Sequence, residues 1–137
     1  MDPNGVILSK LFVIDDYLLK LKNYLPVTKE ELRNNWGLQK IIERSLQVMV
    51  ESMIDIANRI ISRNDGPLPI TSSDSIVRLK DMGVIGKSET YIKMVRFRNL
   101  LVHNYDSLDV DILYAIVSSH LEDFEKFRRE IQSHEKI

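Results

Sequence analysis

Hydrophobic residues recur every three or four positions along most of the chain, a spacing that predicts amphipathic helices rather than strands. The first helix is predicted from about Pro3 to Asn23, and the Leu25-Pro26 pair ends it because proline cannot continue a helix. Its apolar side is expected to consist of Leu8, Leu11, Phe12, Ile14, Leu18 and Leu21.

A second, longer helix is predicted from about Thr28 to Ser62. Thr28-Lys29-Glu30-Glu31 has the spacing of a capping box, and Val27 with Leu32 forms the matching hydrophobic staple. Gly37 is the expected position of a bend in this helix. The apolar stripe is expected to consist of Ile42, Leu46, Met49, Val50, Met53, Ala57 and Ile60.

Turn-forming residues divide the second half of the chain. The segment 64–69, with two prolines and a glycine, is predicted to be a surface loop. A short helix is expected to follow from Ser72 or Ser73 and to end at Gly83. Ser88 is then expected to cap a further helix.

The last helix is predicted to begin at Asp109, whose residue type favours an N-cap. Leu108 and Leu113 are expected to form a second staple, and Asp111 is favourable in the first turn. The apolar residues of this helix are Ile112, Ile116, Val117, Leu121, Phe124 and Ile131. Because no strand pattern competes, the predicted fold is all-α, a four- to five-helix up-and-down bundle in a single domain over residues 1–137.

The composition is that of an ordinary globular protein. The 137 residues, 44% of them hydrophobic and 28% charged, suffice for one domain that buries about two thirds of its unfolded surface. There is no cysteine, the N-terminus lacks the basic start of a signal peptide, and no stretch approaches the ~18 apolar residues of a membrane span. We therefore expect a cytoplasmic protein with no membrane partner.

The formal net charge of −1 argues against a general nucleic-acid binder, which would carry a basic excess. This charge still allows a local pocket built from Lys93, Arg96, Arg98 and His103. Any binding of RNA is therefore expected to depend on a specific site.

The eight residues from Arg98 to Tyr105 carry the most informative chemistry of the chain. Arginine is a fixed cation with a fork of donors suited to phosphate, and histidine can exchange protons near neutral pH. Arg98 and His103 together therefore indicate chemistry on a phosphodiester.

The helix predicted over residues 89–102 is apolar around most of its circumference, which is typical of a buried element. At 100° per residue, His103 points about 140° away from Arg98. His103 lies alongside Arg96 and Asn99, and Asn99 is placed to orient it. Arg98 and His103 can therefore meet only if the helix ends near residue 102 or if a second copy of the chain supplies one of them.

Each of these residues also has an ordinary structural explanation. A buried arginine needs a partner such as a carboxylate, a histidine at a helix end is often a cap, and tyrosines at helical spacing usually pack. His120 is expected at the edge of the core and His134 in a polar tail. No Glu-x-x-His pair of a di-iron bundle occurs, so we expect no metal and no cofactor.

The spacing Arg98-x4-His103-x-Tyr105 resembles the signature of the HEPN superfamily, small all-helical domains that include many metal-independent ribonucleases. The surroundings resemble its HepT-like branch, toxins paired with minimal nucleotidyltransferase (MntA-like) antitoxins. The features that fit this branch are residues 43–46, residues 51–57, Asn99 and the apolar residues 100–102. The similarity extends over nearly the whole chain, roughly residues 8–131.

The resemblance implies an RNA endonuclease with its active site in the cleft of a homodimer. Arg98 and His103 would be the catalytic residues, with Asn99 and Arg96 in supporting positions. Tyr105 would be the residue that a cognate nucleotidyltransferase adenylylates to silence the toxin. The alternative is a non-enzymatic helical module that binds such a nucleotidyltransferase, and the sequence leaves both possibilities open because both use the same bundle.

Overall fold

The computed structural model of the chain describes residues 4–64, 66–103 and 109–137, with the backbone alone described at His103. Within these residues there are no strands and seven helices: α1 (Gly5–Lys22), α2 (Lys29–Asn34), α3 (Trp36–Arg63), α4 (Ser72–Asp81), α5 (Glu89–His103), α6 (Val110–Ser119) and α7 (Leu121–Glu135). The predicted all-α bundle is confirmed.

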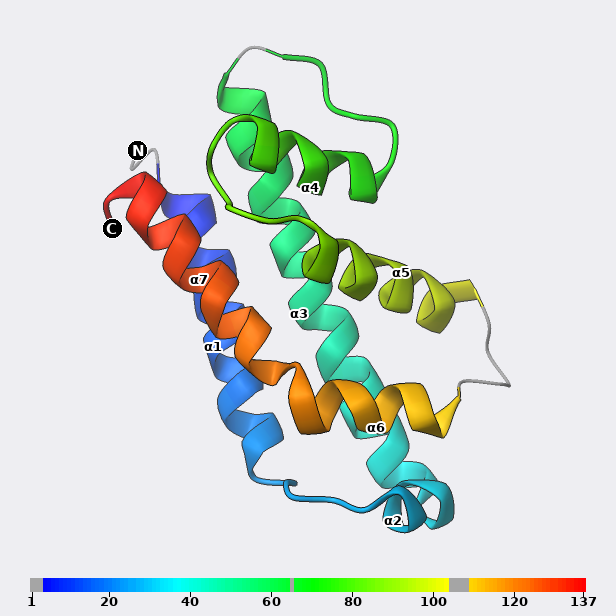
Figure 1. The fold of residues 1–137 in the computed structure, drawn as a ribbon. Coiled ribbons are helices and arrows are strands. Elements are labelled where there is room, and N and C mark those ends of the chain that lie inside the picture. Colours follow the sequence, from blue (N-terminus) through cyan, green and yellow to red (C-terminus); the bar gives the residue numbers. More distant parts are fainter. Residues whose placement is uncertain (1–3, 65, 104–108) are drawn as a thin grey trace.

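The long helix α3 lies at the centre of the bundle and contacts α1, α2, α4 and α5 (Figure 1). The helices α1 and α7 lie along one flank of it, while α6 connects α7 to the far side and packs against α2. The buried hydrophobic side chains of all seven helices belong to one core cluster. This arrangement places α5 and α6 on one side of α3, joined through residues 104–108.

The predicted apolar stripe of α3 is fully buried, as are Phe124 and Ile131 of the last helix. The prediction for α1 was partly wrong, because Leu8 and Phe12 are 43% and 69% exposed. Ile7 is buried in their place. The buried side of α1 therefore consists of Ile7 and of four predicted residues, Leu11, Ile14, Leu18 and Leu21.

Two predicted long helices are each divided. The second breaks at Asn35, not at Gly37: Asn35 has an extended backbone, and its Oδ1 accepts a hydrogen bond from the Leu38 N–H at 2.9 Å. The last breaks at His120, which ends α6, and its Nδ1 lies 2.9 Å from Asp123 Oδ2. In both places the polar side chain bonds locally, which competes with continued helix.

Most helix starts lie where the sequence predicts them. Thr28 Oγ1 accepts from the Glu31 N–H at 3.1 Å, and Asp109 Oδ1 accepts from the Asp111 N–H at 2.8 Å. Thr71 caps α4, which begins at Ser72, and Gly83 follows that helix with φ of 77°. The staple expected from Leu108 lies outside the described residues.

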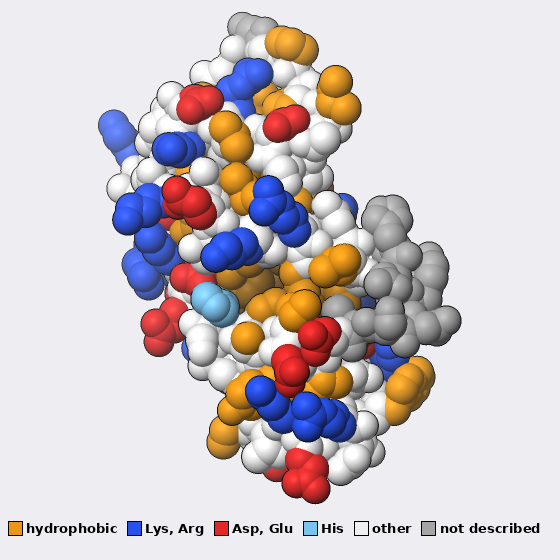
Figure 2. Space-filling view, turned by 45° about the vertical axis from the view of Figure 1, so that its right-hand side comes forward, with side chains coloured by type: hydrophobic (Ala, Val, Ile, Leu, Met, Phe, Trp, Pro, Cys, Tyr) orange, Lys and Arg blue, Asp and Glu red, His pale blue; other side chains and the backbone are white. Residues whose placement is uncertain are grey.

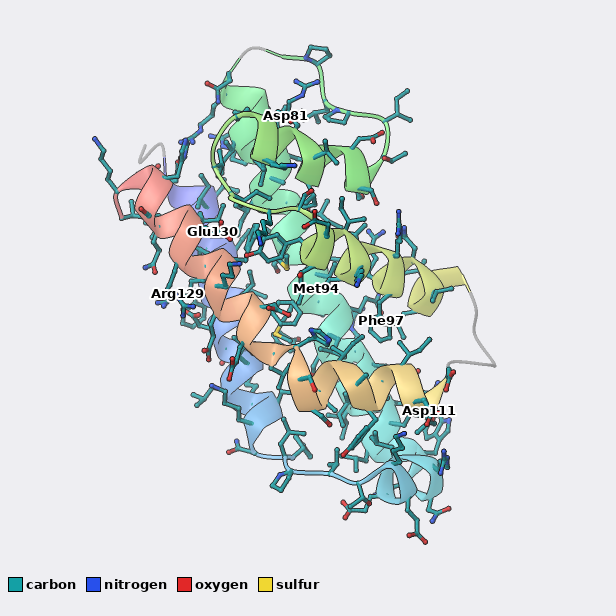
Figure 3. The ribbon with its side chains drawn as sticks, viewed as in Figure 1. Asp81, Met94, Phe97, Asp111, Arg129 and Glu130 are labelled. Atoms are coloured by element: carbon teal, nitrogen blue, oxygen red, sulfur yellow. The ribbon has the colours of Figure 1, made fainter. Side chains whose placement is uncertain are left out.

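The start of α5 is fixed to α7 by a carboxylate. Glu130 accepts hydrogen bonds from the Tyr91 hydroxyl and, at 2.7 Å, from the Gly86 N–H, and it lies on the side of α7 that faces α5 (Figure 3). Burial raises the pKa of the Tyr91 hydroxyl, and the hydrogen bond to Glu130 raises it further. The Tyr91 and Phe127 rings also meet edge to face, with centroids 5.2 Å apart. The axis of α5 is thus set before the helix reaches Arg98.

Within the described part of the chain, none of the helices is both long enough and apolar enough to cross a bilayer.

Candidate active site

The side of α5 that faces the core positions the candidate catalytic residues. Tyr91, Met94, Val95 and Phe97 are at most 5% exposed, and Met94 and Phe97 point toward the neighbouring helices (Figure 3). Arg98 follows directly, with its side chain 25% exposed. Arg98 is therefore partly buried beside α3.

The Arg98 guanidinium is held from two sides and remains open on another. Its Nη1 donates to Asn99 Oδ1 at 2.8 Å, and its Nε lies 3.7 Å from Glu51 Oε1 on α3. The Nε itself is buried and makes no hydrogen bond within the described residues. Because an arginine carries five N–H donors, most of those of Arg98 have no partner among the residues that the structure describes.

Glu51 is itself fixed in place. Gln47, one turn earlier on α3, donates from Nε2 to Glu51 Oε1 at 3.0 Å. The same oxygen therefore contacts both Gln47 and Arg98. The Glu51 carboxylate places a negative charge beside the guanidinium. Neither Gln47 nor Glu51 was predicted from the sequence as part of this site. The available signal was an acid inside a buried apolar stretch of α3, which needs a cation nearby.

The helix geometry separates Arg98 from His103 within one chain. The backbone of α5 is helical through His103, so positions 98 and 103 lie about 140° apart around the helix axis. Of the two possibilities that the sequence left open, an early helix end and a second chain, the structure therefore favours the second.

The supporting residues are placed differently from one another. Asn99 contacts Arg98 rather than serving only as a partner for His103, whose side chain lies outside the description. Arg96 is exposed, and its position lies about 200° around the helix axis from that of Arg98. Tyr105 lies outside the described residues.

A hollow of about 260 Å³ lies between α5 and α6, close to the candidate residues. Figure 2 shows it as a patch of hydrophobic surface with a histidine at the edge. The hollow is lined by Thr90, Lys93, Met94, Phe97, Ile112, Ala115, Ile116 and His120. The His120 side chain is 49% exposed and paired with Asp123, so it acts as a helix-end residue at the border of the core.

The remaining histidine is peripheral to this region. His134 of α7 pairs through Nδ1 with Glu135 at 2.8 Å. No group of three or more His, Asp or Glu side chains that could hold a metal ion occurs among the described residues.

Comparison with known proteins decides the family. The family model of HepT-like ribonucleases matches residues 14–131, which include every helix except parts of α1 and α7. The chain belongs to this family. The predicted family and enzyme class of this HepT-like protein are thereby confirmed.

Individual HepT relatives agree over nearly the whole chain. The mRNA nuclease HepT of Shewanella oneidensis is 32% identical over 126 residues, which cover 90% of this chain and 94% of that protein. The tRNA nuclease HepT of Aphanizomenon flos-aquae is 25% identical over 131 residues, covering 94% and 89%. In structure, the chain is similar to the tri-AMPylated Shewanella oneidensis HEPN toxin in complex with MNT antitoxin, with a TM-score of 0.87, 32% identity and coverage of 95% and 98%.

Proposed function

We propose that this HepT-like protein is the toxin of a toxin–antitoxin pair, a cytoplasmic endoribonuclease that acts as a homodimer of single-domain chains. Arg98 and His103 are its catalytic residues, and it requires no metal or other cofactor. The observation that carries the proposal is the Arg98 guanidinium, which Glu51 and Asn99 hold in place while its remaining donors have no partner within the described residues. The names of the two nuclease relatives support RNA as the substrate.

The chemistry needs one histidine that can take up and release a proton, and one cation. His103 takes the proton of a ribose 2′-OH, the 2′-oxygen forms a bond to phosphorus, and the bond from phosphorus to the 5′-oxygen breaks. The protonated His103 then gives this proton to the leaving 5′-oxygen. Arg98 binds the phosphate and stabilises the charge that grows on its oxygens. The products carry a 2′,3′-cyclic phosphate and a free 5′-hydroxyl.

Replacing His103 by alanine tests the proposal directly. Cleavage of end-labelled RNA in the presence of EDTA is expected to fall by about 10²–10⁴-fold, because a positioned general acid or base contributes that much. His134→Ala is the matched control, because His134 pairs with Glu135 near the end of α7. This variant should cleave RNA at the parent rate. A parent protein that fails to cleave, or that cleaves no faster than His103→Ala, would favour the non-enzymatic binding module.

Silencing of the enzyme is assigned to Tyr105, two residues after His103. The proposed partner is an MntA-like nucleotidyltransferase, supported by the complex and the AMP groups of the similar Shewanella toxin. An AMP on Tyr105 brings a negative phosphate that competes with RNA for Arg98. Incubation with this partner and ATP is expected to add one or more AMP masses to the parent and none to Tyr105→Phe. Modification that persists in Tyr105→Phe, or AMP-bearing protein that still cleaves RNA, would refute this assignment.

A further inference from the structure

One face of α3 leads from its exposed first residue to the Arg98 site. Helical spacing places Trp36, Lys40, Arg44, Gln47 and Glu51 within about 80° of one another around the helix. We call these five residues the α3 row. Glu51, the last of them, contacts Arg98. At 1.5 Å per residue the row is about 22 Å long, and it starts where α3 meets α2 (Figure 1).

The aromatic end of the row is a flat surface open to solvent. Trp36 is 70% exposed and is the single tryptophan of the chain. Lys40 Nζ lies 5.8 Å from the centre of its ring, a cation–π contact that holds the lysine beside the indole. One exposed apolar residue alone is ordinary. The cations that continue along the same face are what distinguish this position.

The charges of the row favour an anion. Glu43, at the border of the row, is largely buried, and one of its oxygens lies 3.2 Å from Lys40 Nζ. Glu51 is engaged by Gln47 and Arg98. Arg44 is exposed and has no ion-pair or hydrogen-bond partner within the described residues. Its guanidinium is therefore a free phosphate ligand between the indole and Arg98.

We propose that the α3 row is a binding track for single-stranded RNA that delivers a phosphodiester to Arg98. A base stacks on Trp36, Lys40 and Arg44 contact successive phosphates, and Gln47 and Glu51 adjoin the scissile group held by Arg98. Stacking surfaces interleaved with cations are how proteins bind single strands without reading their sequence. The track rests on the proposed nuclease function for its substrate, and it explains how a chain of net charge −1 can hold RNA.

Binding can be measured without cleavage. A short 2′-O-methyl oligoadenylate lacks the 2′-OH nucleophile, so it serves as a stable probe for the intact parent protein. Because the chain has one tryptophan, stacking is expected to quench the fluorescence of Trp36 in proportion to occupancy. Fluorescence anisotropy of the labelled probe then gives the Kd for variants that lack the indole.

The variants separate stacking from charge. Trp36→Ala is expected to raise the Kd about tenfold, and Trp36→Phe to restore much of the affinity. Arg44→Ala is expected to lower the salt dependence of binding, the slope of log K against log salt, by about 0.7, since one phosphate contact is lost. Phe12→Ala, which removes an aromatic side chain of similar exposure on α1, and Arg129→Ala, which removes an exposed cation on α7, are the matched controls. Both should bind as the parent does.

The outcomes distinguish the track from the nuclease activity itself. A parent that cleaves RNA, with no quenching and an unchanged Kd in Trp36→Ala, overturns the track and leaves the enzyme intact. Quenching and Trp36-dependent binding in a parent that cleaves no RNA uphold the track and refute the proposed function. A third outcome is that Trp36→Ala binds RNA as the parent does but no longer has the mass of a dimer. This outcome overturns the track and assigns this face to contact between two copies of the chain.

Discussion

At the residue scale, two kinds of contact compete for the Arg98 guanidinium: an ion pair within the fold and a phosphate of the substrate. The pair with Glu51 is loose, with 3.7 Å between Nε and Oε1 and side-chain exposures of 25% and 37%. An exposed ion pair of this kind contributes about 0–1 kcal/mol to stability. The geometry therefore favours a role for Arg98 in binding phosphate over a role in holding the fold.

Arg98→Lys and Arg98→Ala should reveal which role dominates. Lysine keeps the charge but cannot donate two parallel hydrogen bonds to one phosphate. We therefore expect the cleavage rate to fall about 10²-fold with little change in melting temperature. Arg98→Ala should lose at least as much activity. Lys10→Ala, which breaks an exposed ion pair to Asp55, calibrates the thermal effect of losing such a pair. Full activity in Arg98→Lys, with a melting temperature several degrees lower in Arg98→Ala, would make Arg98 a structural residue.

At the scale of helices, local signals predicted some capped helix starts and missed others. Thr28 and Asp109 were both predicted as starts and both accept the expected backbone hydrogen bonds. Asn35 and His120 were missed because the apolar spacing continues across each break, and spacing alone cannot detect a one-residue interruption. Only the competing local hydrogen bonds of these two side chains mark the breaks.

Contacts between helices were harder to predict than the helices. Arg98 is a candidate from the sequence because it lies near a histidine, but its ion-pair partner Glu51 lies on a different helix. Which carboxylate a buried cation meets depends on how α5 crosses α3, and no local pattern encodes that. In α1, by contrast, helical spacing alone separates Leu8 by about 100° from Ile7, which lies on the same side as the other buried residues of the helix.

At the scale of the whole molecule, the separation of Arg98 and His103 along α5 supports a site shared between two chains of a symmetric homodimer. In a continuous α5, positions 98 and 103 lie about 140° apart around the helix axis, on different sides of a single helix. In the proposed homodimer, a two-fold axis beside α5 would bring Arg98 of each chain toward the partner's His103. A homodimer of this kind holds two composite sites, each with one arginine and one histidine.

Mixing two inactive variants tests for composite sites. Arg98→Ala and His103→Ala homodimers should each be inactive. After the two are unfolded together and refolded in equal amounts, half of the dimers are mixed, and each mixed dimer has one complete site and one empty site. About a quarter of the parent activity should therefore return, provided that the protein is a dimer at micromolar concentration by light scattering. Sites contained within one chain would return none, because every chain in the mixture lacks one of the two residues.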